Sequence, residues 1–227
     1  MIMKVAIDGP AGAGKSTIAR KVAKQLGFIY VDTGMLYRAV GLTVLRHGVS
    51  LQNADGIIQL LPKISIALIF QDGEQRTMLG DEDVTEKLWT SEVSMAASTV
   101  SALPQVRKFL LDLQRGLAEE QSVIMDGRDI GTVVLPDAQV KIFLTASAGE
   151  RAKRRYEELL KKGEQVSYED VLEQLMQRDQ QDSIRKEAPL KQAQDAYFLD
   201  TSKIGLEESV EAVIQLIEHN GKVGKEL

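Results

Sequence analysis

The residues of this sequence that most plainly carry chemistry lie near its start. The segment Gly9-Pro-Ala-Gly-Ala-Gly14-Lys15-Ser16 fits the pattern G-x-x-x-x-G-K-[ST]. Glycines let the backbone wrap closely around an anion, so that its N–H groups can cradle phosphate oxygens. We expect Lys15 to lie on an exposed loop, from which it can reach the β- and γ-phosphates of a nucleotide, and the Ser16 hydroxyl can hold Mg²⁺. A glycine-rich turn without a ligand is the alternative, but the segment also falls between a predicted strand and a predicted helix, as phosphate binding requires.

Arginines form a second candidate set. Phosphoryl transfer to an acceptor that is itself a phosphate brings two polyanions together, and several cations must offset their repulsion. The planar fork of arginine binds phosphate oxygens in pairs. Taken singly, each candidate except Arg128 is more typical of a solvated surface or an ion pair. Arg128 follows a predicted buried strand, where ligands of open α/β sheets usually bind. The candidates are Arg38, Arg128, Arg151, Arg155, Arg178 and Arg185.

Short apolar runs predict the strands that would position these residues. A helix from Ser16 to Leu26, with Gly27 as its stop, follows the first strand. Short apolar strands that alternate with helices predict an α/β fold with a parallel sheet covered on both faces. The predicted strands are Lys4 to Asp8, Phe28 to Asp32, Ser122 to Asp126, Val140 to Leu144 and Ala196 to Asp200.

Two stretches interrupt this alternation. Ile64 to Phe70 and Gln75 to Leu79 flank Asp72-Gly73, a hairpin signal that predicts a small antiparallel insertion. Gly149 to Glu187 is a highly charged helical region, in which Ser167 and the acidic residue three positions later resemble a capping box. Its dense charge predicts that it has little core to bury and is mobile without a ligand.

The composition narrows the class of protein. A chain of 227 residues with 44% hydrophobic and 27% charged residues is typical of one globular domain with a sizeable core. The absence of cysteine excludes disulfides and cysteine metal sites and fits a cytoplasmic protein. A net charge of −5 argues against a nucleic-acid partner. No apolar run is long enough to span a bilayer. The sequence contains no Asn-Lys-x-Asp motif, which argues against a GTPase.

Several motifs together resemble the bacterial cytidylate kinase family, over nearly the whole chain. They are Ile7-Asp-Gly-Pro-Ala-Gly-Ala-Gly-Lys-Ser-Thr17, Asp32-Thr-Gly-Met-Leu-Tyr-Arg38, Met125-Asp-Gly-Arg-Asp-Ile-Gly-Thr-Val-Val-Leu-Pro-Asp-Ala138 and Arg178-Asp179 with Arg185-Lys-Glu-Ala-Pro189. The resemblance implies a three-layer P-loop kinase fold with a five-stranded parallel sheet. It also implies transfer of the γ-phosphoryl group of ATP to CMP or dCMP with Mg²⁺, in pyrimidine nucleotide metabolism.

The resemblance also divides the chain into regions. It implies a core in residues 1–32, 119–150 and 188–227, a CMP-binding region in 33–118 and a lid in 151–187. The insertion at about 63–84 resembles an extra small sheet of the family's CMP-binding region.

The expected partners are the small molecules ATP and CMP or dCMP. We expect a monomer in the cytoplasm, without a nucleic-acid or membrane partner.

The family pattern assigns residues to two nucleotide sites. Lys15, Arg128 and Arg185 would be catalytic. ATP would lie against Gly9, Pro10, Ala11, Gly12, Ala13, Gly14, Lys15, Ser16 and Thr17. Arg38, Arg128 and Arg185 would hold the CMP phosphate, with Thr33 nearby. Ser98, Arg107 and Asp129 would read cytosine, and Arg178 and Asp182 would contact the sugar.

Some of these positions keep alternatives. Asp126 is a candidate to order Mg²⁺ through water, and it could equally cap a turn. Arg151 and Arg155, four apart on one helix face, could grip ATP phosphates or form a solvated basic face. Ser98 could be an ordinary helix residue. Among whole functions, a related kinase of UMP, AMP or shikimate and a nucleotide-binding regulator without catalysis are the rivals.

Overall fold

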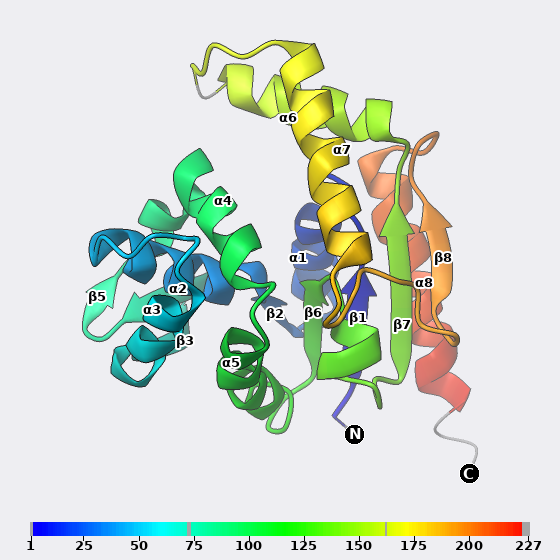
Figure 1. Ribbon diagram of the computed structural model, residues 1–227. Helices are drawn as coiled ribbons and strands as arrows, with labels where there is room; N and C mark the ends of the chain where they lie inside the picture. The colour runs from blue at the N-terminus through cyan, green and yellow to red at the C-terminus, as the bar shows by residue number, and fades with distance from the viewer. Residues whose placement is uncertain (1, 72–73, 162, 224–227) are drawn as a thin grey trace.

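The computed structural model describes residues 2–71, 74–161 and 163–223. Its central sheet has five parallel strands: β1 (Lys4–Asp8), β2 (Ile29–Asp32), β6 (Val123–Gly127), β7 (Val140–Thr145) and β8 (Tyr197–Asp200). Each predicted strand is confirmed, with its ends moved by no more than one residue. The order across the sheet is β2-β6-β1-β7-β8 (Figure 1). Because β1 lies between β6 and β7, the segments that follow β1 and β6 meet at the carboxyl edge of the sheet, where ligands bind in open α/β sheets.

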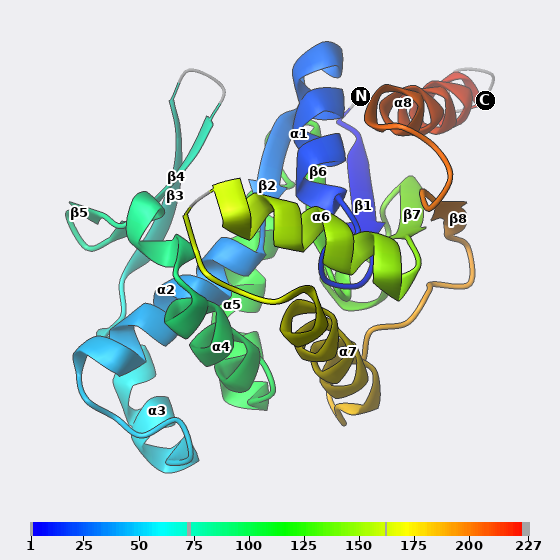
Figure 2. The same ribbon diagram turned by 90° about the horizontal axis from the view of Figure 1, so that it is seen from above.

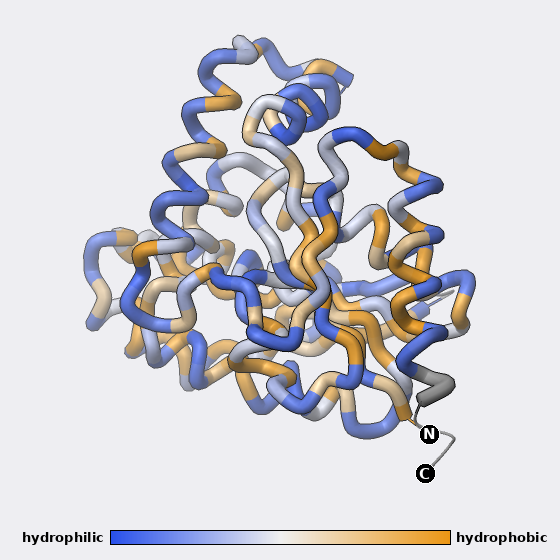
Figure 3. The backbone as a smooth tube through the Cα atoms, turned by 90° about the vertical axis from the view of Figure 1, so that its right-hand side faces the viewer, coloured by the Kyte–Doolittle hydropathy of each residue, from blue (hydrophilic) through white to orange (hydrophobic). Residues whose placement is uncertain are grey.

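Helices cover both faces of this sheet. Helices α1 (Lys15–Leu26) and α8 (Leu206–Val223) lie on one face, as Figure 2 shows. Their side chains pack on Ile7, Ile142 and other sheet residues in one buried cluster. On the other face, a second buried cluster contains Ile130 of a π-helical turn, η3 (Ile130–Val134), and Leu111 of helix α5 (Pro104–Gly116) packs against it. The predicted three-layer α/β fold is confirmed. Figure 3 shows the hydrophobic residues gathered along the strands.

The sequence of α1 explains where the helix begins and ends. Ile18 and Val22 are buried on the sheet, at the spacing of one helix face. Gly27 follows the last helical residue in the left-handed conformation, with φ 68°, and its N–H bonds to the carbonyl oxygen of Ala23. This C-terminal stop was predicted, and it is confirmed. The helix starts one residue earlier than predicted, at Lys15.

A second sheet stands beside the first. It contains β3 (Ile66–Gln71), β4 (Glu74–Leu79) and β5 (Glu82–Asp83), all antiparallel. The predicted pair of strands is confirmed, β5 was not predicted, and the turn at Asp72-Gly73 lies outside the described residues. The side-chain amide of Gln75 accepts a hydrogen bond from the backbone N–H of Asp32 at 2.8 Å and donates to its carbonyl oxygen at 3.3 Å. The insertion is thereby joined to β2, an edge strand of the main sheet.

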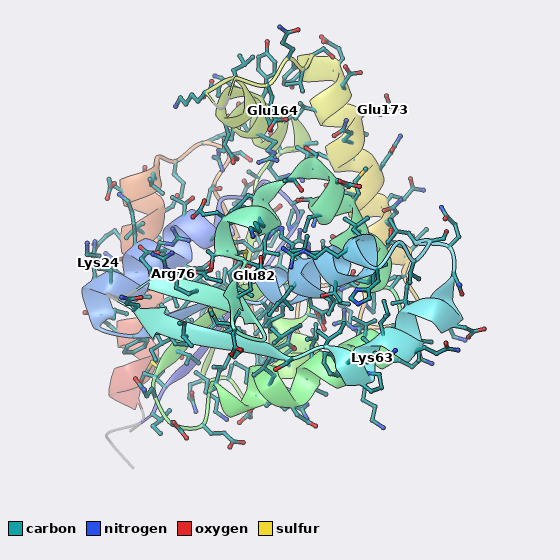
Figure 4. All side chains as sticks on the ribbon, turned by 90° about the vertical axis from the view of Figure 1, so that its left-hand side faces the viewer. Lys24, Lys63, Arg76, Glu82, Glu164 and Glu173 are labelled. Atoms are coloured by element: carbon teal, nitrogen blue, oxygen red, sulfur yellow. The ribbon has the colours of Figure 1, made fainter. Side chains whose placement is uncertain are left out.

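Helices pack against one face of this second sheet and form two further buried clusters with it. The outer surface carries charged residues, among them Arg76 and Glu82 in Figure 4, and Glu82 pairs with Arg46 at 2.6 Å. The remaining elements between β2 and β6 are α2 (Gly34–Arg46), α3 (Ala54–Leu60), η1 (Leu61–Lys63), η2 (Thr85–Trp89) and α4 (Ser91–Val100).

Two charged helices, α6 (Ala148–Lys161) and α7 (Tyr168–Ile184), stand at the carboxyl edge of the sheet (Figure 1). The Ser167 hydroxyl accepts a hydrogen bond from the N–H of Asp170 at 3.0 Å, so the predicted cap is confirmed. The expectation that this region has little core is wrong. Ala152, Leu159, Val171 and Leu175 lie on facing stripes of the two helices and form a buried cluster with Ala11. Charged residues such as Glu164 and Glu173 cover the outside (Figure 4). Among the residues described, no helix is long and apolar enough to cross a membrane.

Candidate active site

Glycines shape the loop between β1 and α1. Gly9 approaches β7 so closely that a Cβ atom would lie 1.9 Å from the carbonyl oxygen of Leu144. Gly14 caps α1 with φ 87°, a left-handed conformation that glycine adopts without steric cost. The loop therefore leads directly into a helix N-terminus, where free N–H groups and the helix dipole favour an anion. Of the other loop residues assigned to ATP, Pro10, Ala11 and Ala13 are buried, and Gly12 and Thr17 are exposed.

Lys15 is buried at the start of α1, with 6% of its surface exposed. Its Nζ donates a hydrogen bond to the carbonyl oxygen of Pro10 at 2.9 Å. Burial, followed by the nearby charge of Arg128, lowers the pKa of Lys15 to about 7. The expectation that Lys15 lies on an exposed loop is thus wrong, because β1 and the helices around the sheet edge enclose it. An anionic ligand beside Lys15 would raise its pKa again and so favour its charged form.

Ser16 and Asp126 bring two side-chain oxygen atoms together beside the loop. The Ser16 hydroxyl donates to Oδ2 of Asp126 at 2.9 Å, and the Tyr30 hydroxyl donates to Oδ1 at 3.1 Å. Burial, and then the charge of Asp32, raise the pKa of Asp126 to about 7. A buried carboxylate next to a hydroxyl suits a hard cation such as Mg²⁺, which binds few protein oxygens and keeps water or phosphate oxygens as its other ligands. The residues present therefore fit the implied ion.

Arg128 lies just beyond β6, and its environment is an ion-pair network. Its Nε donates to Oδ2 of Asp182 at 2.8 Å, and Arg185 lies 3.7 Å from the other oxygen of the same carboxylate. Burial alone would raise the pKa of Asp182, but Arg128, Arg178 and Arg185 outweigh burial and lower it. Burial, and then Arg128, lower the pKa of Arg178 to about 10. Positive charge therefore exceeds negative charge in this buried region.

Some of these guanidinium groups have donors that no described residue satisfies. Nε of Arg38, Nε of Arg178 and Nη2 of Arg185 are buried and make no hydrogen bond within the described chain. The Arg38 guanidinium also stacks over Trp89, with 5.0 Å between Cζ and the ring centroid. Buried donors without acceptors are costly, and a site that receives an anionic ligand explains them. Thr33, at the start of α2, is buried with its hydroxyl donated to the carbonyl oxygen of Asp126 at 2.8 Å.

The predicted base-reading residues are partly brought together. Asp129 is buried and ion-pairs with Arg107, and Oδ1 of Asp129 lies 3.7 Å from Nη2 of Arg185. Arg107 also stacks on Tyr37, 5.5 Å from the ring centroid. Ser98, on α4, is connected to Arg107 indirectly. The Ser101 hydroxyl donates to the Ser98 carbonyl oxygen at 2.8 Å, and the Ser101 carbonyl accepts from Arg107 at 3.3 Å.

The two arginines of α6 differ in their surroundings. Arg151 is buried and donates to the carbonyl oxygens of Ala146 at 2.9 Å and Ala11 at 2.8 Å, while its Nη2 pairs with Asp179 of α7 at 2.6 Å. It thus connects the phosphate-binding loop to both charged helices. Arg155 pairs with Glu158 at 2.9 Å on its own helix. Among the described residues, Arg151 hydrogen-bonds to the loop, whereas the ion pair of Arg155 is with Glu158.

Sequence reasoning missed several residues of the site. Tyr30 and Asp32 surround Asp126, and Trp89 supports Arg38. Arg154 was assigned no role, yet it donates to the carbonyl oxygen of Thr201 at 2.8 Å and approaches that of Ala13 at 3.5 Å. The signal available for Tyr30 and Asp32 was their place at the end of β2, beside the end of β6. No local pattern in the sequence marks Trp89 or Arg154.

The parallel sheet, the glycine-rich loop and the buried arginines together define a P-loop phosphotransferase. The family model described as "Cytidylate kinase" matches residues 5–219. A cytidylate kinase from Carboxydothermus hydrogenoformans is 50% identical over 221 residues, covering 97% of this chain and 100% of the relative. Another, from Caldanaerobacter subterraneus subsp. tengcongensis, is 52% identical over 222 residues, covering 98% and 97%. The chain belongs to the cytidylate kinase family.

A likeness among solved structures agrees at the level of the fold. A crystal structure of an uncharacterized protein from Eubacterium ventriosum superposes with a TM-score of 0.54 at 12% identity, covering 95% of this chain and 98% of the other. At that identity the similarity supports only the shared α/β architecture. The family membership rests on the sequence relatives, and it makes this chain an enzyme of the kinase class.

Proposed function

We propose that this chain transfers the γ-phosphoryl group of ATP directly and in line to a phosphate oxygen of CMP or dCMP, forming CDP or dCDP. The observation that carries the proposal is the set of buried arginine donors without acceptors beside the phosphate-binding loop, on Arg38, Arg178 and Arg185. The acceptor is already an anionic oxygen, so the reaction needs neither a general base nor a covalent enzyme intermediate. Catalysis then consists of positioning and charge stabilisation.

The loop from Gly9 to Thr17 binds the phosphates of ATP. Lys15 leaves the Pro10 carbonyl and binds the β- and γ-phosphate oxygens, whose charge restores its ordinary pKa. Together with Arg128 and Arg185, it stabilises charge on the transferring group. Arg151 and Arg155 of the lid contribute further positive charge toward ATP, and the pairing of Arg151 with Ala11 supports that role for Arg151.

The side-chain oxygens of Ser16 and Asp126 would hold Mg²⁺. The chemistry that this ion would supply is neutralisation of the charge on the phosphate oxygens. The Tyr30 hydroxyl, which donates to Asp126, holds this carboxylate in place. The fit rests on two oxygen donors 2.9 Å apart and on a carboxyl whose ionised form lacks a full counter-charge.

CMP lies between the arginine cluster and α4. Arg38, Arg128 and Arg185 bind its phosphate, with Thr33 beside it. Asp182 and Arg178 contact the sugar. Asp129, Arg107 and Ser98 read cytosine, because the N4 amino group can donate to a carboxylate and the O2 and N3 atoms can accept from a guanidinium. The ion pair between Arg107 and Asp129 keeps donor and acceptor side by side, as this edge of cytosine requires.

The chain works in three regions: a core (1–32, 119–150, 188–227), a CMP-binding region (33–118) and a lid (151–187). Lid closure excludes water that would otherwise hydrolyse ATP. The enzyme acts as a monomer in the cytoplasm, on small-molecule substrates, without a nucleic-acid or membrane partner. Its negative net charge supports the absence of nucleic acid from this set.

An assay of ADP release, coupled to NADH oxidation, tests the proposal with CMP, dCMP, UMP, AMP and shikimate as acceptors. We expect CMP and dCMP to have the highest kcat/KM. A higher value for UMP, AMP or shikimate would assign the chain to a rival kinase. No ADP release with any acceptor, in a folded protein that binds ATP, would favour a regulator without catalysis.

A further inference from the structure

Asp8 is the last residue of β1, and its buried carboxylate makes two backbone contacts on the neighbouring segment. Oδ1 accepts the N–H of Ile130 at 2.7 Å, and Oδ2 accepts the N–H of Gly131, also at 2.7 Å. Only 5% of the surface of Asp8 is exposed. One side chain thus binds two consecutive peptide groups that are more than 120 positions away in the chain.

These two N–H groups begin the π-helical turn η3, and the first N–H groups of any helical segment lack partners within it. Buried without an acceptor, each would cost a lost hydrogen bond. Gly131 allows the close approach, because a Cβ atom there would lie 3.3 Å from Oδ2 of Asp8 and 3.2 Å from Cδ of Lys141. The carboxylate therefore fixes both the start and the position of the turn.

The position of Asp8 connects the two halves of the site. It directly precedes Gly9, the first residue of the phosphate-binding loop, and the turn that it holds directly follows Arg128 and Asp129. In the sheet, Asp8 also pairs with Gly127, at the end of β6. The segment from Gly127 to Gly131 is consequently held to β1 both by strand pairing and by this carboxylate.

We propose that Asp8 is a positioning residue for the CMP side of the reaction. Its carboxylate fixes the Arg128-Asp129 segment relative to the phosphate-binding loop, so that the acceptor phosphate and the base are aligned with ATP. This inference rests on the roles proposed above for Arg128 and Asp129. Burial raises the pKa of Asp8 to about 6, in spite of the two N–H donors, which lower it. Burying the ionised carboxylate costs free energy of desolvation, and a positioning role accounts for that cost.

The test is Asp8→Asn, which keeps the shape but replaces one acceptor oxygen with an NH₂ group that opposes a peptide N–H. Amide hydrogen exchange of the ligand-free variant should be faster than in wild type by about tenfold or more at Ile130 and Gly131. The KM for CMP should rise by about tenfold, while the Kd for ATP, measured without CMP, changes by less than twofold.

Ser122→Ala is the matched control for general destabilisation. The Ser122 hydroxyl oxygen accepts the Met3 N–H at 3.0 Å just before β6, at the amino edge of the sheet and away from both nucleotide sites, so its loss should lower the melting temperature but leave both constants unchanged. Unchanged exchange at Ile130 and Gly131 in Asp8→Asn would overturn the inference, as would parallel losses of CMP and ATP affinity. A failure of the proposed function would appear separately, as a wild-type enzyme that does not prefer CMP.

Discussion

We expect the replacement of Asp129 by asparagine to change the base that the enzyme prefers. The carboxylate offers only acceptors to the N4 amino group of cytosine, whereas uracil presents the O4 acceptor at that place. Asparagine has nearly the same shape but adds an NH₂ donor, which can face O4. We expect Asp129→Asn to weaken CMP and to strengthen UMP as a substrate.

The magnitude follows from the burial of the pair. The side chains of Arg107 and Asp129 are 10% and 6% exposed, so a mismatched polar group there has little access to water. An unsatisfied buried group costs about 1–3 kcal/mol, which corresponds to about 5- to 150-fold in kcat/KM. The ratio of kcat/KM for CMP to that for UMP should fall by a factor in this range. The variant also weakens the ion pair with Arg107, so its melting temperature should fall.

The assay measures kcat/KM for both nucleotides at neutral pH in wild type and variant, with Asp182→Asn as the control. Asp182 is also buried and also pairs with an arginine, Arg128, but we assign it to the sugar. In the control both substrates should weaken together and their ratio should stay constant. If the ratio also stays constant in Asp129→Asn, then Asp129 serves only to hold Arg107, and the base-reading role is refuted.

Three further predictions concern the loop, the pH dependence of stability and the lid. Lys15→Met should remain folded, since the side chain is already buried, but kcat should fall by about a thousandfold or more, because the transferring group loses a close cation; near-normal turnover would exclude that role. Burial raises the folded-state pKa of Asp126 to about 7, so the stability of the ligand-free protein should decline as pH rises from 4 to 7, and urea unfolding of Asp126→Asn should lose this decline. Lys15 affects stability at higher pH, because its lowered pKa makes the free energy of unfolding rise from pH 7 to 10. Lys15→Met should abolish that rise. Hydrogen exchange in α6 and α7 should slow when ATP and CMP are bound together, and equal protection with and without them would contradict closure of the lid.

The main sheet could be predicted from local patterns because each of its strands is a short apolar run bounded by a turn or a helix. The phosphate-binding loop could also be predicted from its local sequence, because its glycines and Lys15 form a motif that is typical of one backbone geometry. The small core between α6 and α7 was missed, because charged residues dominate both helices. Its few apolar residues, such as Leu159 and Leu175, become buried only when the two helices pack against each other.

The site could be predicted as a set of residues, but not as a network. The sequence places Arg128 and Asp129 after a strand, yet it does not say that their partners are Asp182 and Arg107, which lie 54 and 22 positions away. Such pairings depend on how distant elements pack. The burial of Lys15 was missed for the same reason, since enclosure of the loop depends on tertiary structure rather than on the motif.

The most direct test of the proposed reaction follows the phosphoryl group itself. ATP radiolabelled at the γ-phosphate is mixed with excess enzyme and CMP for a single turnover, quenched in acid and separated. Direct transfer predicts that the label appears in the β-phosphate of CDP, with none bound to protein and little as inorganic phosphate. Label that stays on the protein, or that is released as phosphate while CMP is unchanged, would contradict direct transfer from ATP to CMP.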